Sequence, residues 1–100
     1  MEITVKRTGG FGAPSTDESW GPVDTAQAGD VGQQLEGLVN QVGFFDLNAE
    51  YPPGGPDQFD YAVEVVDGDR QHTVSYAELN EDVPNEIKEI TKLVIDQSGS

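Results

Sequence analysis

The 100-residue sequence lacks cysteine and contains a single histidine, His72. Without cysteine the chain has no disulfides, no thiolate chemistry and no cysteine-ligated metal site, which agrees with a reducing compartment. No second histidine is present to complete a zinc site with His72, and no serine or threonine lies in a nucleophile motif. We therefore expect no metal ion, no cofactor and no enzymatic activity. We interpret His72 as a strand residue that hydrogen-bonds to a neighbouring group.

Basic residues are also scarce, with 5 lysines and arginines against 19 acidic residues and a formal net charge of −14. Such a surface repels phosphate backbones and anionic lipids, so we expect no binding to nucleic acid or membrane. Three explanations of the acidity remain open: solubility or adaptation to high salt, steering toward a basic partner, and mimicry of DNA. The acidic residues are scattered rather than spaced like phosphates, which favours the first explanation.

Long apolar runs are missing as well. Residues 1–7 contain no apolar stretch of the signal-peptide type, and no segment is long enough to cross a bilayer. These features predict a cytoplasmic protein. We also expect the chain to be monomeric when it is free. The length suits a single domain over residues 1–100, in which residues 97–100 form a frayed tail.

Alternating apolar and polar residues predict two strands in the first quarter of the chain. Ile3 and Val5 alternate with polar neighbours and mark the first strand. Residues 19–25 form the second strand, which contains Gly21 and Pro22. Because proline cannot donate to a sheet ladder, we expect this strand to lie at a sheet edge or to be interrupted.

A β-hairpin is predicted in the second half of the chain. Apolar and polar residues alternate over residues 59–65, and a returning strand covers residues 72–76. Asp67-Gly68 lies between them and favours a tight turn with positive φ at both central residues.

Two helices complete the predicted elements. Asp30 is expected to be the N-cap of the first helix, because its carboxylate can accept the free amide hydrogens of the first turn. Gly43 ends this helix as a C-cap glycine, and Pro84 occupies the first position of the second helix. The apolar stripes are Val31, Leu35, Leu38, Val39 and Val42 in the first helix and Ile87, Ile90, Leu93 and Val94 in the second.

The predicted order is strand, strand, helix, strand, strand, helix (ββαββα). An isolated hairpin is marginally stable in water, so the two halves are expected to share one sheet with the helices packed on it. The predicted fold class is therefore α+β, with a four-stranded antiparallel sheet and two helices.

A glycine-flanked aromatic residue follows the first strand and is the first candidate for partner contact, with Gly9, Gly10, Phe11, Gly12 and Ala13. The glycines permit close backbone approach, and Phe11 supplies a large apolar anchor. A second interpretation remains open, in which Phe11 folds back onto the sheet as part of the core. Tyr51, with prolines and glycines beside it, is a second contact candidate, whereas Trp20 is expected in the core or at its edge.

Short motifs follow one another along the chain: Gly9-Gly10-Phe11, Val23-Asp24-Thr25, Leu38-Val39, Phe44-Phe45-Asp46-Leu47, Asp57-Gln58-Phe59-Asp60-Tyr61, Asp67-Gly68, His72-Thr73-Val74 and Pro84. In this order they resemble the emfourin family, which comprises protein inhibitors of thermolysin-like metallopeptidases. The resemblance covers nearly the whole chain. It is the ordered set, rather than any single motif, that carries it.

The resemblance implies a tight-binding inhibitor that blocks the active-site cleft of a bacterial zinc protease, usually encoded nearby. The zinc ion would then belong to the partner. Our hypothesis places Phe11 in the pocket that accepts a large apolar side chain just after the scissile bond, with the glycine backbone along the cleft. The alternative from another class is an acidic interaction protein, such as a DNA mimic or a regulatory adaptor, without a protease target.

Overall fold

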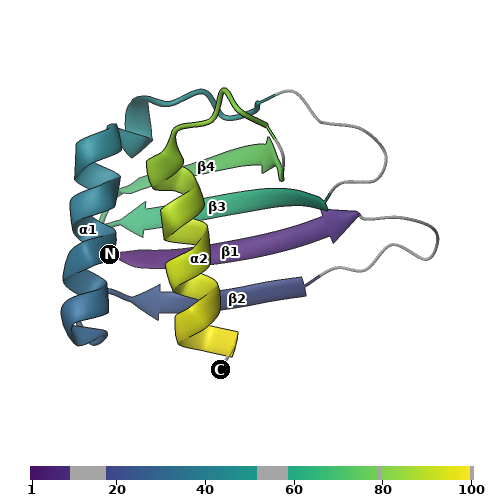
Figure 1. The fold of residues 1–100 in the computed structure, drawn as a ribbon. Coiled ribbons are helices and arrows are strands. Elements are labelled where there is room, and N and C mark those ends of the chain that lie inside the picture. The colour runs from purple at the N-terminus through teal and green to yellow at the C-terminus, as the bar shows by residue number, and fades with distance from the viewer. Residues whose placement is uncertain (10–17, 52–58, 79, 100) are drawn as a thin grey trace.

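The computed structural model describes residues 1–9, 18–51, 59–78 and 80–99. Its elements are β1 (Glu2–Gly9), β2 (Glu18–Asp24), α1 (Gly29–Val42), the short 3-10 helix η1 (Phe44–Asp46), β3 (Phe59–Asp67), β4 (Arg70–Ala77) and α2 (Asn85–Gly99). Figure 1 shows this arrangement. The predicted order ββαββα is confirmed, and η1 is an addition to it.

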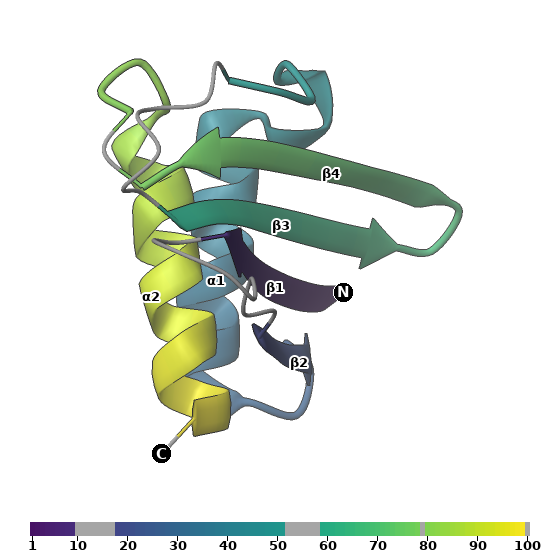
Figure 2. The same cartoon turned by 90° about the vertical axis from the view of Figure 1, so that its right-hand side faces the viewer.

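The four strands form one antiparallel sheet in the order β2-β1-β3-β4. Ile3 lies opposite Val23 on one side and Val65 on the other, so apolar residues of neighbouring strands face the same side. Both helices cover that side, as the edge-on view in Figure 2 shows. Helix α2 packs across β2, β1 and β3, and α1 packs beside α2. The fold is the predicted α+β class, built as two layers.

The core lies between the sheet and the helices. Apolar side chains recur with a period of two in the strands and near 3.6 in the helices, so each element has one apolar face. Its largest fully buried side chains are Phe44, Ile3, Leu35, Ile87, Ile90, Val5, Val39, Val63, Val65, Val74 and Val94. Each such side chain stabilises the fold by roughly 1.5–3 kcal/mol relative to an exposed position. The predicted apolar stripes of both helices therefore do face the core.

Strand β2 lies at a sheet edge, as predicted from its glycine and proline. Its register against β1 shifts between Ile3 and Val5, where Gly21 and Pro22 are located. Gly21 has a φ of 102°, and a Cβ there would lie 2.7 Å from the carbonyl oxygen of Ile3. Only glycine fits this irregularity, because a side chain would collide with the backbone of β1.

The predicted N-cap of the first helix is wrong. Asp30 lies within the first turn, the cap residue is Ala28, and no side chain caps the helix. The preceding turn uses Asp24 instead, whose carboxylate accepts a hydrogen bond from the N–H of Ala26 (3.0 Å). Gly32 then packs so closely on Thr25 that a Cβ would lie 1.9 Å from the Thr25 carbonyl oxygen. Because of this contact the helix begins at Gly29, before the predicted first residue. Asp30 interacts favourably with the positive end of the helix dipole from inside the first turn.

The helix end is as predicted. Gly43 has a left-handed conformation with a φ of 65°, and its N–H donates to the carbonyl oxygen of Asn40 (3.3 Å). Glycine adopts this conformation without a steric penalty and so closes the helix. The chain then continues directly into η1, whose Phe44 is fully buried.

The predicted hairpin is confirmed, but its turn differs in detail. Asp67 pairs with Arg70, so the central residues are Gly68 and Asp69. Gly68 has a φ of 63°, whereas Asp69 does not have a positive φ. A turn with glycine at its first central position needs positive φ at that residue alone. The pairing of β3 with β4 moves the turn one residue beyond the predicted place.

Helix α2 also differs from the prediction at both ends. It begins at Asn85, one residue after Pro84, whose carbonyl oxygen accepts a hydrogen bond from the N–H of Ile87 (3.0 Å). It continues to Gly99 and so includes residues 97–99, which the sequence placed in a frayed tail. Gln97 and Ser98 are exposed, and neither side chain prevents a solvated helical turn before the final glycine.

Candidate protein-contact site

The two candidate contact segments leave the sheet at the same end. Gly9, the last residue of β1, pairs with Phe59, the first residue of β3. Gly10, Phe11, Gly12 and Ala13 lie outside the described residues. The segment over residues 52–58 ends at Phe59, so both segments are joined to adjacent strand ends. We call this end of the sheet the Phe59 end, and the opposite end, with the β3–β4 turn, the Gly68 end (Figure 1).

Tyr51 is held against β4 near the Phe59 end. Its N–H donates to the carbonyl oxygen of Ser75 (2.8 Å), and the N–H of Ser75 donates to the carbonyl oxygen of Ala49 (2.8 Å). Its side chain is half-buried and packs against the core. Tyr51 also lines a cavity of about 290 Å³ together with Asp60 and Tyr76. The structure thus brings the attachment points of Tyr51 and Gly9 to one end of the sheet.

Arg7 forms a cluster at this end that the sequence did not predict. Its guanidinium makes an ion pair with Glu18, directly opposite in β2. The same group lies over the ring of Phe59, 4.4 Å from its centroid, and over the ring of Trp20, 5.3 Å from its centroid. The hydrogen bond to Glu18 raises the pKa of Arg7, burial opposes this, and Tyr61 adds a smaller increase. Arg7 therefore connects β2, β1 and β3, and Trp20 lies at the core edge as predicted.

Tyr76 anchors α2 to the sheet next to this cluster. Thr91 donates its hydroxyl hydrogen to the carbonyl oxygen of Ile87 (3.0 Å), so the Tyr76 hydroxyl donates to the Thr91 oxygen (2.7 Å). Burial raises the pKa of Tyr76 to about 12, and the group stays neutral at ordinary pH. Tyr61 stacks on Tyr76 with ring centroids 5.5 Å apart. Tyr76 therefore has a structural role, and Tyr61 lies between Tyr76 and Arg7, each of which is its partner in a neighbouring strand.

His72 has the structural role that the sequence predicts. Its Nε2 lies 2.8 Å from the carbonyl oxygen of Leu47, and because a carbonyl only accepts, Nε2 carries the hydrogen. The ring packs edge-on against Phe44, with centroids 5.7 Å apart. Among the described residues, no group of three or more His, Cys, Asp and Glu side chains is placed to hold a metal ion. Within the same residues, no helix combines the length and apolarity needed to span a membrane.

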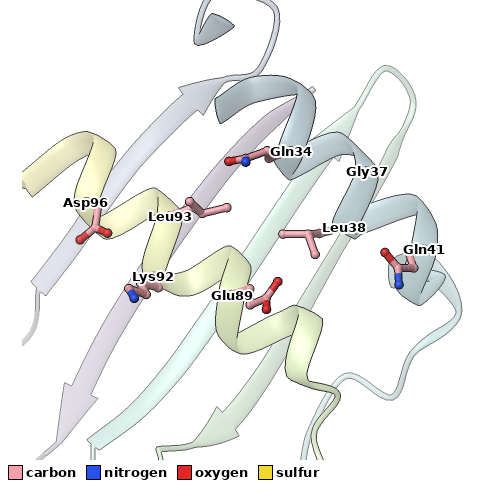
Figure 3. Close-up of a pocket in the computed structure, with 8 residues that line it drawn as sticks. All are labelled: Gln34, Gly37, Leu38, Gln41, Glu89, Lys92, Leu93 and Asp96. Carbon is pink, nitrogen blue, oxygen red and sulfur yellow. The ribbon is translucent and has the colours of Figure 1, made fainter. Parts of the chain in front are cut away.

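A larger cavity of about 600 Å³ lies between the two helices, away from the Phe59 end. Figure 3 shows Leu38 and Leu93 pointing into it from α1 and α2. The remaining lining residues are Gln34, Gly37, Gln41, Glu89, Lys92 and Asp96. No nucleophile is paired with a base among them, so this groove offers no arrangement for catalysis.

The described residues therefore show a two-layer fold with partly exposed aromatic residues at one sheet end, and such residues are enriched in protein contact surfaces. The sequence matches the emfourin family over residues 5–94, and the chain therefore belongs to this family. The family is known as inhibitors of thermolysin-like metalloproteases, which implies a non-enzymatic role and a metalloprotease partner. No curated protein matches the sequence, and no solved structure matches it.

Proposed function

We propose that this chain inhibits a thermolysin-like zinc metalloprotease by binding at its active-site cleft and occluding it. The observation that carries the proposal is the family match from residue 5 to residue 94, which runs from β1 into α2. The catalytic zinc ion belongs to the protease. The chain contributes a binding surface and acts as a single monomeric domain.

The proposed contact residues are Gly9, Gly10, Phe11, Gly12, Ala13 and Tyr51. Phe11 fills the pocket of the protease that accepts a large apolar side chain just after the scissile bond. The pairing of Gly9 with Phe59 supports this placement, because it attaches the segment to a central strand of a packed sheet. A contact carried on a rigid element loses less conformational entropy on binding than one on a free chain.

The net charge of −14 supports the same proposal through the kinetics of association. A strongly acidic protein is steered toward a partner with positive charge around its cleft, and this attraction falls as salt is added. The association rate with the target protease is therefore expected to decrease with ionic strength. The dissociation rate is expected to change less.

The test is a titration of the whole chain into several thermolysin-like proteases with a peptide substrate. Loss of activity at near-equimolar concentration of the chain is the expected result for at least one of them. Full activity of all of them would falsify the proposal. Retention of the chain by a DNA-binding protein, with release by DNA, would instead support the acidic interaction protein as the function.

A further inference from the structure

We infer that the partly exposed side chains around Arg7 form a second contact surface for the proposed protease partner. This Arg7 cluster consists of Arg7, Trp20, Phe59 and Tyr61. The inference rests on the proposed function, and it extends the contact beyond Gly9–Ala13 and Tyr51 to the sheet itself. The cluster fits an apolar recess in a partner surface that carries positive charge overall.

The distribution of exposed aromatic rings is the first observation. In the described part of the chain, Phe44 and Tyr76 are buried and five other aromatic residues are partly exposed. Four of those five lie at the Phe59 end, namely Trp20, Tyr51, Phe59 and Tyr61, and Phe45 lies at the Gly68 end. Tryptophan, tyrosine and arginine are enriched among residues that dominate binding energy in protein interfaces.

Phe59 differs from the other partly exposed rings in the groups that its side chain contacts. Trp20, Tyr51 and Tyr61 pack against the buried core, whereas Phe59 is not among the described residues that do so. Its ring is covered by the guanidinium of Arg7 at 4.4 Å instead. A ring that contributes little to the core and still has a fixed position is suited to contact another molecule.

The cluster is held in place before any partner arrives. Arg7 is tied to Glu18 by an ion pair, and its side chain is only 25% exposed. Tyr61 is tied to the buried Tyr76 by stacking. Binding through these side chains costs little additional ordering, and a cation over an aromatic ring contributes about 0.5–2 kcal/mol to holding the geometry.

Both signs of charge lie near the cluster although the chain is strongly acidic. Arg7 is paired with Glu18. On the α2 side, Tyr61 lines a cavity of about 300 Å³ whose charged residues are Lys88, Lys92, Glu78 and Asp96. Three of the five basic residues of the chain therefore lie here, together with these acidic residues and with Asp60 and Glu50 beside Tyr76. Aromatic surface that is flanked by basic as well as acidic side chains can enter an apolar recess, while the net charge of −14 still attracts a positively charged partner.

The Gly68 end provides a matched control, because it contains the same chemistry. The guanidinium of Arg70 lies 4.3 Å from the centroid of the Phe45 ring and makes an ion pair with Asp67 (3.0 Å). If each arginine–phenylalanine pair only stabilises the sheet, changes at the two ends should affect binding alike. A contact surface should affect binding at the Phe59 end alone.

The experiment compares Phe59→Ala with Phe45→Ala against a thermolysin-like protease that the unaltered chain inhibits. The inhibition constant is measured and corrected for the folded fraction obtained from urea unfolding. We expect Phe59→Ala to raise the constant about ten-fold or more, which corresponds to about 1.4 kcal/mol, and Phe45→Ala to change it by about three-fold or less. Equal effects of both changes, or no effect of Phe59→Ala, overturn the inference and leave the proposed function standing.

A second measurement needs no substitution. The chain has a single tryptophan, so incorporation of 5-fluorotryptophan gives one fluorine resonance that reports on Trp20. Addition of the same protease, inactivated at its catalytic glutamate, should shift and broaden this resonance. An unchanged resonance at saturating protease contradicts the inference. If the unaltered chain inhibits no protease, the proposed function fails and this inference fails with it.

Discussion

The two ends of the sheet use the same residue types in different ways. At the Gly68 end, β3 and β4 are joined by a two-residue turn, and Arg70 is 61% exposed beside Asp67. At the Phe59 end, Arg7 is 25% exposed and bridges three strands through Glu18, Trp20 and Phe59. The Gly68 end is joined by a tight turn. The Phe59 end has four of the partly exposed aromatic residues, and the longer connecting segments are attached there. An arginine over an aromatic ring is therefore a candidate contact only where the fold leaves both side chains at an exposed site.

The largest expected effect concerns the Gly68 end and stability alone. Phe44 is fully buried and packs edge-on against Phe45 and His72. Phe44→Ala should lower the free energy of unfolding by about 3–5 kcal/mol, because it removes apolar contacts and leaves a cavity. Urea unfolding measures this loss. Inhibition per folded molecule should remain unchanged, and a matching loss of inhibition would remove the functional distinction between the ends.

The next prediction concerns binding through Phe11, the proposed contact residue. Phe11→Ala should weaken inhibition more than ten-fold, about 1.4 kcal/mol or more, if the ring is a contact anchor. The inhibition constant and the unfolding midpoint are measured on the same preparation. A loss of about 3 kcal/mol or more in stability, with binding per folded molecule intact, would assign Phe11 to the core instead.

A matched pair of arginine substitutions compares the two ends directly. Arg7→Ala should reduce stability by about 1–2 kcal/mol, because it removes an ion pair and stacking on two rings that connect three strands. Arg70→Ala should cost about 0.5 kcal/mol or less, since an exposed pair is screened by water. Thermal and urea unfolding of both variants test this order. Similar losses for the two would show that the bridging geometry of Arg7 adds no stability.

The last prediction concerns the turn at the Gly68 end. Gly68 has a positive φ, and a Cβ there would meet no atom within 4 Å, so only the backbone conformation penalises a side chain. Gly68→Ala should therefore cost about 1 kcal/mol of stability. Inhibition should be unaffected. Weaker inhibition by this variant, in excess of its folded fraction, would place part of the contact surface at the Gly68 end.

Local patterns in the sequence predicted much of this fold. The alternation around Val63 and Val65, the apolar stripe of α1 and the terminating Gly43 all depend on neighbours in sequence. The element order and the edge position of β2 followed from the same signals. The errors are local too. Asp30 was assigned a capping role that its position does not permit, because the packing of Gly32 on Thr25 sets the helix start.

The candidate contact residues divide in a similar way. The sequence alone marked Gly9, Phe11 and Tyr51 through their glycine and proline neighbours, because unusual backbone requirements can be read from residue types. It did not mark Arg7 or Phe59, since each belongs to an ordinary alternating strand. The one signal was the opposite charge of Arg7 and Glu18 on either side of the segment between β1 and β2.

Local sequence patterns are enough to predict which segments form strands and helices and which face of each element is apolar, because side-chain direction repeats with a fixed local period. The position of β1 between β2 and β3 does not follow from these local patterns and is known from the fold alone. That order places Arg7 over Phe59 and beside Trp20, and it brings Gly9 into register with Phe59. Residues from distant parts of the chain become neighbours through strand order and register, which depend on the packing of the whole core.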